Sequence, residues 1–387
     1  MTVARLRPFG ETVFAEMSAL ATRHDAINLG QGFPDADGPA SMLAAAQRAI
    51  ADGRNQYPPG IGVPELRRAV ADHQRRHYGL DYDPDTEVLV TVGATEAIAG
   101  AVVGLVEPGA EVVLIEPYYD SYAATVAMAG ATRRIVPMIP DGDGFRLDRT
   151  ALSSAFGPQT AAIIVNSPHN PTGTVLSDDD LAAIADLCRA HDAIAISDEV
   201  YEHLLFDGRT HRSIATFPGM RERTVRISSA AKTFNCTGWK VGWASGPAEL
   251  VAGVRAAKQF MSYVGSGPFQ PAVAQALDTE MAWVARSAEA LADKRDILSS
   301  ALHDAGFVVH RSEATYFVCA DPRPLGFDDG ARFCRELPER IGVAAVPVSA
   351  FVDDEQPWRH LVRFAFAKHD EVLREAAGRL RGLRPGD

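Results

Sequence analysis

Short apolar runs alternate with amphipathic segments between residues 88 and 227. Because these runs are apolar at nearly every position, they are typical of parallel strands that are covered on both faces. A short apolar run can also belong to a buried helix, so the prediction of a sheet depends on the regular alternation. The runs are VLVTV (Val88–Val92), VVLI (Val112–Ile115), AAIIV (Ala161–Val165), AIAI (Ala193–Ile196) and VRI (Val225–Ile227).

One of the intervening segments carries the signals of a helix. Ser177 and Asp180 resemble a capping pair, and apolar residues recur from Leu181 to Cys188 at helical spacing. Strands that alternate with helices predict an α/β fold with a mostly parallel central sheet flanked by helices.

The pattern changes after residue 267. An Ala-rich helical pattern runs from Pro271 to His303, and strand-like VVH, TYFVC and VRFAFA runs follow it. We therefore expect a large domain over residues 46–275. A smaller α+β domain is expected to combine residues 1–45 with residues 276–387.

Composition and charge narrow the possible functions. The chain has 387 residues, 47% hydrophobic and 23% charged, which is typical of a globular protein of two or three domains. The net charge of −12 argues against nucleic-acid and anionic-membrane partners. No apolar stretch is long enough to span a bilayer, and no secretory signal is apparent.

The four cysteines form no CxxC pair and no metal-ligand pattern, so we expect no metal site. A reducing compartment is the simplest interpretation of such cysteines. The sequence therefore predicts a cytoplasmic protein.

A polar or aromatic cluster follows each predicted strand. Ligands bind at the carboxyl ends of strands in open α/β sheets, so we expect the five clusters to meet at one edge. In chain order they are GATE (Gly93–Glu96), EPYYDSY (Glu116–Tyr122), NSPHNPTG (Asn166–Gly173), SDEVY (Ser197–Tyr201) and SSAAKTFNCTGWK (Ser228–Lys240).

Three positions in these clusters suggest chemistry. The Gly93–Thr95 turn precedes an apolar helix, so its amides can bind phosphate, although a plain turn is the alternative. Asp198 ends a buried strand, where a carboxylate needs a partner, and a structural salt bridge is the alternative. Lys232 lies in a serine-rich turn, and a partly desolvated site close to Lys240 favours the uncharged amine that attacks a carbonyl.

Taken together, the motifs resemble class I/II aminotransferases of pyridoxal-5′-phosphate (PLP) fold type I, from about Phe14 to Lys368. The likeness is strongest to actinobacterial N-succinyldiaminopimelate aminotransferases of lysine biosynthesis, with kynurenine and methionine aminotransferases as relatives. The matching motifs are LGQGFPD (Leu29–Asp35), NQYPPGIGVPELR (Asn55–Arg67), NSPHNPTG, SDEVYEHL and KTFNCTGWKVGW.

The resemblance implies roles around the PLP ring. Lys232 would carry the cofactor as a Schiff base and move the proton between substrate Cα and cofactor C4′. Asp198 would pair with the pyridinium nitrogen, so that the ring can accept electron density. Asn170 and Tyr201 would bind the phenolic oxygen, and Tyr119 would stack on the ring. The implied catalytic residues are Lys232, Asp198 and Tyr201.

The resemblance also implies how the phosphate and the substrate bind. Tyr57 would reach the phosphate of the neighbouring subunit, which predicts a homodimer with shared active sites. Arg363 would bind the substrate α-carboxylate, assisted by the Gly30 backbone and Asn170, and a surface salt bridge is its alternative. Phe14 would line the substrate pocket. The phosphate cradle would consist of Ala94, Thr95, Ser229 and Lys240.

The sequence departs from the motifs of kynurenine aminotransferases at two positions, and three functions are possible for the chain. GATE lacks the aromatic residue of kynurenine aminotransferases, and Phe14 replaces a tryptophan of several relatives; both argue against kynurenine as substrate. Transfer from glutamate to a 2-oxo acid is the first function, and β-elimination on cysteine conjugates is the second. A PLP-fold transcriptional regulator would need a DNA-binding domain, and no basic helix-turn-helix pattern is present.

For a long anionic substrate we expect a cationic or amide-rich patch, within Phe14–Phe33 or Gln259–Gln270.

Overall fold

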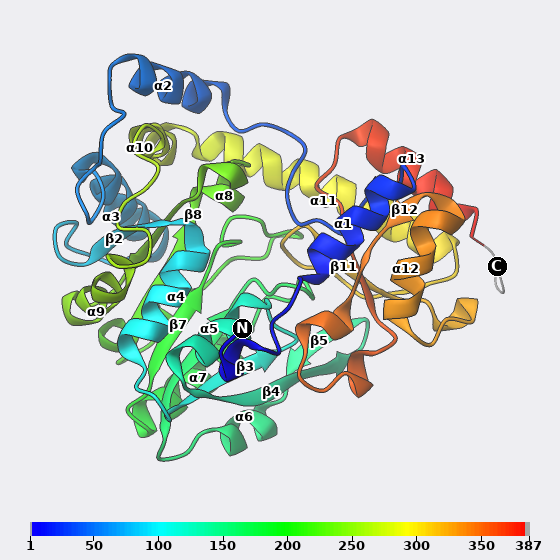
Figure 1. The fold of residues 1–387 in the computed structure, drawn as a ribbon, viewed down its shortest axis with the longest axis horizontal. Helices are drawn as coiled ribbons and strands as arrows, with labels where there is room; N and C mark the ends of the chain where they lie inside the picture. The colour runs from blue at the N-terminus through cyan, green and yellow to red at the C-terminus, as the bar shows by residue number, and fades with distance from the viewer. Residues whose placement is uncertain (1, 384–387) are drawn as a thin grey trace.

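The computed structural model describes residues 2–383, and its core is an eight-stranded sheet (Figure 1). All five predicted strands belong to this sheet. They are β2 (Val88–Val92), β3 (Glu111–Glu116), β6 (Thr160–Asn166), β7 (Ile194–Asp198) and β8 (Thr224–Ser229). The strand order is β2-β9-β8-β7-β6-β3-β4-β5.

The centre of the sheet, from β8 to β4, is parallel, and its edges are antiparallel. The sheet is therefore mixed. Because β9 is antiparallel to both of its neighbours, β2 runs in the same direction as β8, and the carboxyl ends of all five predicted strands meet at one edge. Three strands of this sheet were not predicted: β4 (Thr132–Asp141), β5 (Gly144–Leu147) and β9 (Val241–Ser245).

Helices cover both faces of this sheet. Val112 and Leu114 of β3 pack against one helical layer, and Val113 and Ile115 pack against the opposite layer, as the pleat of a strand requires. The first layer contains α4 (Gly93–Leu105), α5 (Ser121–Ala129) and α9 (Ala248–Lys258). The second contains α6 (Arg149–Ala155) and α7 (Asp178–Ala190). The predicted capping box at Ser177 and Asp180 is present at the start of α7.

A second, four-stranded antiparallel sheet forms the smaller domain. Helix α1 lies beside α12, and β1 pairs with β12, so the N-terminal segment packs with this part of the chain (Figure 1). The sheet consists of β10 (Val308–Val309), β11 (Phe317–Asp321), β14 (Val362–Ala365) and β13 (Val346–Pro347). The other elements are α1 (Val13–Arg23), β1 (Ile27–Asn28), α12 (Gly330–Ile341), β12 (Val343–Ala344) and α13 (Asp370–Arg381).

The helical pattern from Pro271 to His303 forms two helices in the structure. They are α10 (Phe269–Thr279) and α11 (Met281–Asp304), separated at Glu280. Helix α10 packs on α2 (Ala40–Ala51) and α3 (Pro64–Tyr78), whereas α11 packs on α13. One continuous helix could not follow both surfaces, so the chain changes direction between them. The exact domain boundaries stay a prediction.

Within residues 2–383, no helix is both long enough and apolar enough to cross a membrane. The four cysteines are buried and unpaired. The cytoplasmic location stays a prediction.

Candidate active site

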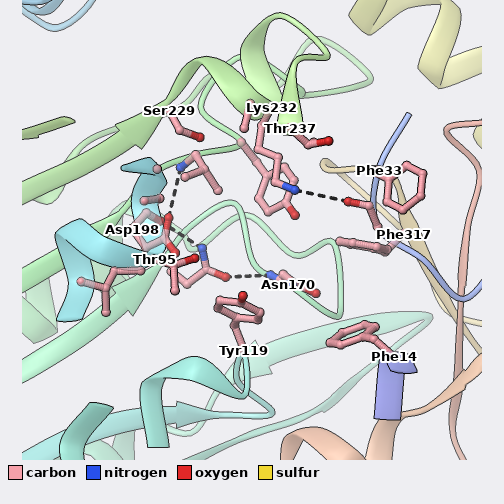
Figure 2. A pocket seen from close by; sticks show the side chains of 18 of the residues that line it. Phe14, Phe33, Thr95, Tyr119, Asn170, Asp198, Ser229, Lys232, Thr237 and Phe317 are labelled. Carbon is pink, nitrogen blue, oxygen red and sulfur yellow. Dashed lines mark hydrogen bonds between the residues drawn. The ribbon is translucent and has the colours of Figure 1, made fainter. Parts of the chain in front are cut away.

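The polar clusters at the carboxyl edge of the large sheet line one cavity of about 380 Å³ (Figure 2). Side chains from the second sheet and from the N-terminal segment complete its walls. The residues proposed from the sequence that line it are Phe14, Ala94, Thr95, Tyr119, Asn170, Asp198, Tyr201, Ser229, Lys232, Lys240 and Arg363. The cavity therefore brings together eleven of the thirteen candidate residues.

Asp198, the last residue of β7, is a buried carboxylate without a cationic partner within 4 Å in the described chain. Its Oδ2 accepts a hydrogen bond of 2.6 Å from the Tyr122 hydroxyl, and its Oδ1 accepts one of 3.3 Å from the Val200 N–H. Burial raises the pKa of Asp198 to about 6 in spite of these hydrogen bonds. A cationic group beside this carboxylate would relieve the cost of its burial.

Lys232 approaches from the short helix α8 (Ala230–Thr233), which follows β8 directly. The predicted serine-rich turn is thus a single helical turn. Its amine donates to the Tyr316 hydroxyl at 2.8 Å and to the Gly32 carbonyl oxygen at 3.2 Å. Figure 2 shows the side chains of Lys232 and Asp198 in the same cavity.

The start of α4 and Lys240 form a cradle with the properties of an anion site. Gly93 has φ = +75°, and a Cβ at this position would lie 3.2 Å from Lys240 Nζ. A glycine therefore lets the lysine approach the helix N-terminus closely. Within the described residues, no carboxylate lies within 4 Å of Lys240 Nζ. The free N–H groups, the Thr95 and Ser229 hydroxyls and one cation can bind a phosphate.

Arg363 is a fully buried guanidinium that has no carboxylate partner within 4 Å among residues 2–383. It donates to Asn170 Oδ1 at 2.9 Å and to the Gly30 carbonyl at 3.0 Å, and its Nε has no partner. The guanidinium lies 3.9 Å from the centre of the Phe317 ring. Burial lowers the pKa of Arg363 to about 10. The surface salt bridge considered as its alternative is excluded.

Comparison with known proteins agrees with this geometry. The family model "Aminotransferase class I and II" matches residues 24–380. The chain belongs to this family. It is a PLP-dependent aminotransferase, as the family is PLP-dependent, and it has the type I fold with a mixed sheet and a smaller sheet domain.

Several relatives of this aminotransferase match along nearly its whole length. It is 64% identical to the probable N-succinyldiaminopimelate aminotransferase DapC of Mycobacterium tuberculosis, over 98% of both chains. The structure of N-succinyldiaminopimelate aminotransferase from that organism has a TM-score of 0.98 and covers 99% of this chain and 100% of the other. The methionine aminotransferase of Escherichia coli is 40% identical over 98% of both chains, and mouse kynurenine–oxoglutarate transaminase 3 is 37% identical over 95% of this chain and 87% of its own.

Two candidate residues of the aminotransferase lie outside the cavity wall. Tyr57 is 82% exposed in the single chain and packs against Tyr263 at a ring distance of 5.8 Å. Gly30 contacts the site through its carbonyl on Arg363, whereas its N–H donates to Asn28 Oδ1. Their proposed roles stay predictions, as do the roles of the residues in the cavity.

Sequence reasoning missed two tyrosines that contact the central groups. Tyr122 binds Asp198, and Tyr316 binds Lys232. Tyr122 lies within the cluster after β3, but its sequence position alone does not separate it from Tyr119. Tyr316 follows no strand of the large sheet, so the rule of strand ends does not find it.

One buried group outside the cavity has the residue types of a metal site. The ligand atoms of His73, Glu202 and His203 lie within 4.8 Å of one another. Glu202 already binds Arg226 at 3.0 Å, and burial lowers the pKa of His73 to about 3 and that of His203 to about 4. The two ring Nε2 atoms contact each other at 2.7 Å. This group is explained as a hydrogen-bonded network, and the absence of a metal requirement stays a prediction.

Proposed function

We propose that the aminotransferase binds PLP in the 380 Å³ cavity and reversibly transfers an amino group between N-succinyl-LL-2,6-diaminopimelate and 2-oxoglutarate. In the reverse direction, glutamate donates the amino group to the 2-oxo acid that corresponds to the succinylated substrate. The assignment of this substrate rests on the 64% identity, over 98% of both chains, to a probable N-succinyldiaminopimelate aminotransferase. The fit of the cavity to PLP has independent support from its charges.

Three features of the cavity match three parts of PLP. The buried Asp198 carboxylate matches a protonated ring nitrogen, the cradle of Gly93 and Lys240 matches a phosphate, and the Lys232 amine matches a carbonyl carbon. Tyr119, Asn170 and Tyr201 line the space between them. When bound, PLP supplies an electron sink for the pair released at substrate Cα.

The chain's own residues then have distinct tasks. Lys232 takes the proton from substrate Cα and returns it to the cofactor carbon, as a general base and acid. Tyr122 keeps Asp198 oriented through its hydrogen bond of 2.6 Å. Arg363 binds the α-carboxylate of either substrate, because its unpartnered Nε and its fork suit a bidentate carboxylate.

The distal end of a long substrate has room beside Phe14 and Tyr119. These two residues also line a neighbouring groove of about 1070 Å³. This groove contains Gln356, Arg335 and Arg359, but five carboxylates also line it, and the two arginines pair with Glu16 and Asp329. The expected cationic patch therefore stays a prediction. The segment Gln259–Gln270 lines neither space within the described chain.

We further propose that the active enzyme is a homodimer in which Tyr57 reaches the partner's phosphate. The exposed aromatic residues Tyr57, Phe260 (86% exposed) and Tyr263 support a subunit contact. A mixed dimer of Lys232→Ala and Tyr57→Ala chains tests this. If Tyr57 acts across the interface, the mixed dimer keeps one complete site. If it acts within its own chain, neither site is complete.

Two substrate experiments test the reaction. The enzyme incubated with glutamate alone forms pyridoxamine phosphate if it transaminates, whereas release of pyruvate from cystathionine without a 2-oxo acid indicates β-elimination. In a panel of donors, the succinylated substrate is expected to have the highest kcat/KM. Equal values for methionine, glutamine and kynurenine would contradict the substrate assignment while leaving the family unchanged.

A further inference from the structure

The hydroxyl of Tyr316 contacts the amine of Lys232, and none of the roles above uses it. Tyr316 is completely buried, and its Oη lies 2.8 Å from Lys232 Nζ and 2.6 Å from the Gly32 carbonyl oxygen. Lys232 Nζ lies 3.2 Å from the same carbonyl oxygen. Amine, phenol and carbonyl therefore form a closed triangle beside the cavity.

The direction of each hydrogen bond in this triangle follows from valence. The Gly32 carbonyl can only accept, so the single hydroxyl proton of Tyr316 is donated to it. Toward Lys232, the Tyr316 oxygen must then accept. The amine thus donates one N–H to Tyr316 and another to Gly32, and one further position on its nitrogen is left for chemistry.

The three groups come from distant parts of the chain. Gly32 belongs to the N-terminal segment, Lys232 to α8, and Tyr316 immediately precedes β11 of the second sheet. No carboxylate lies within 4 Å of Lys232 Nζ in the described residues. The amine is therefore held by two neutral groups rather than by an ion pair.

We propose that Tyr316 is a positioning residue: together with the Gly32 carbonyl it holds the Lys232 amine whenever that amine is not bonded to the cofactor. This proposal rests on the proposed function, in which Lys232 moves the α-proton. It adds a residue and a geometry to that step.

The same two contacts serve both directions of proton transfer. A neutral amine uses its two N–H bonds on Tyr316 and Gly32, so its lone pair occupies the remaining position and can accept the proton from substrate Cα. The electron pair of the broken C–H bond remains with the substrate and the cofactor. The resulting ammonium keeps both hydrogen bonds, and its third N–H then occupies the position that the lone pair had. The proton is delivered from that position without reorientation of the lysine.

The first test is Tyr316→Phe in the holoenzyme. We expect kcat for the glutamate half-reaction to fall about 10- to 100-fold, as loss of orientation does, with KM within about threefold of the parent. The deuterium isotope effect with α-deuterated glutamate should increase, because proton transfer becomes more rate-limiting. A variant with an unchanged isotope effect and an unchanged kcat would overturn the proposal.

A second test does not depend on turnover. When PLP is mixed with the cofactor-free chain, the visible absorbance of the bound cofactor should appear about 10-fold more slowly in Tyr316→Phe than in the parent, because the amine is no longer aimed. The matched control is Tyr82→Phe, which removes a buried hydroxyl that has no hydrogen-bond partner. If both variants capture PLP at the parental rate, the proposal is wrong.

Lys232→Ala distinguishes a failure of the proposed function from a failure of the positioning role of Tyr316. Should this variant still bind PLP covalently and turn over, the proposed function fails. Should it lose both while Tyr316→Phe behaves like the parent, only the positioning role fails. Thermal unfolding of each variant identifies a loss of rate that comes from a loss of folded protein, which would also count against positioning.

Discussion

Asp198→Asn is expected to stabilise the cofactor-free chain, although it removes a residue that we place in the cofactor site. Burial raises the pKa of Asp198 from 3.8 to about 6. A pKa difference of this size corresponds to about 3 kcal/mol of destabilisation when the carboxylate is charged, because one pKa unit is about 1.4 kcal/mol. Asparagine has a similar shape and carries no charge, so it does not incur this cost.

The substitution loses part of this gain. An amide has one oxygen, which can keep the 2.6 Å hydrogen bond from Tyr122, but its NH2 group then faces the Val200 N–H that donates at 3.3 Å in the parent. Loss of that long hydrogen bond costs about 1 kcal/mol. We therefore expect a net stabilisation of about 2 kcal/mol at pH 7.5.

The pH dependence gives the sharper signature. The folded pKa of Asp198 lies above the unfolded value, so the folded state holds its proton more tightly. The contribution of Asp198 to the stability of the parent therefore falls as pH rises from about 4 to 6, and it is constant above pH 6. The advantage of Asp198→Asn should be largest above pH 6 and should shrink toward pH 4.

Glu199, the adjacent residue, is the matched control with the opposite sign. It is equally buried, but Arg226 and His211 bind it, and the pKa of Glu199 is lowered to about 2. Its contribution is present above pH 4.5 and is lost as pH falls toward 2. Glu199→Gln should therefore destabilise the chain by about 3 kcal/mol at pH 7.5.

Urea unfolding of the cofactor-free parent and both variants between pH 5 and 8 measures these differences. An Asp198→Asn variant that is less stable than the parent at pH 7.5, or whose advantage does not depend on pH, would contradict a costly buried charge at this position. Saturating PLP should stabilise the parent more than Asp198→Asn, because binding to the folded state adds stability only where affinity is retained.

Two further predictions concern the ends of the cavity. Arg363→Lys should lower kcat/KM for glutamate about 10- to 100-fold, because an ammonium lacks the fork for a carboxylate; steady-state kinetics with an amine substrate that lacks the carboxylate should show little change. Gly93→Ala should weaken PLP binding about 10-fold, because the new Cβ would lie 3.2 Å from Lys240 Nζ at a φ of +75°; equilibrium titration with PLP measures this, and unchanged affinity would contradict the cradle.

The sequence predicts the parts of the fold that follow from burial. Strands β3, β6 and β7 are covered by apolar layers on both faces, so their apolar runs are continuous and recognisable. Strand β4 contains Arg133 and Arg134 and has exposed or half-exposed positions along most of its length, so no continuous run marks it. The break at Glu280 depends on which surfaces α10 and α11 cover, and helical periodicity does not contain that information.

The candidate site also contains residues that the sequence pattern predicts and residues that it does not. Asp198 ends a strand of the large sheet, and Asn170 and Lys232 follow other strands of it, so topology alone brings them to one edge. Arg363 comes from the second sheet, and only the family resemblance assigns it to the cavity. The resemblance to a known family, and not the hydrophobic pattern, therefore predicted that Arg363 belongs to the site.

Neither the strand pattern nor the family resemblance identified Tyr122 and Tyr316. Each contributes a single hydroxyl whose importance lies in one distance, 2.6 Å to Asp198 and 2.8 Å to Lys232. A tyrosine at the edge of a core packs its ring equally well with or without such a partner, so neither hydrophobic pattern nor motif spacing reveals the contact. The contact exists because packing of the surrounding segments sets the position of the ring, and a change of Tyr to Phe preserves that packing. Such substitutions therefore separate what these hydroxyls do for the site from what their rings do for the fold.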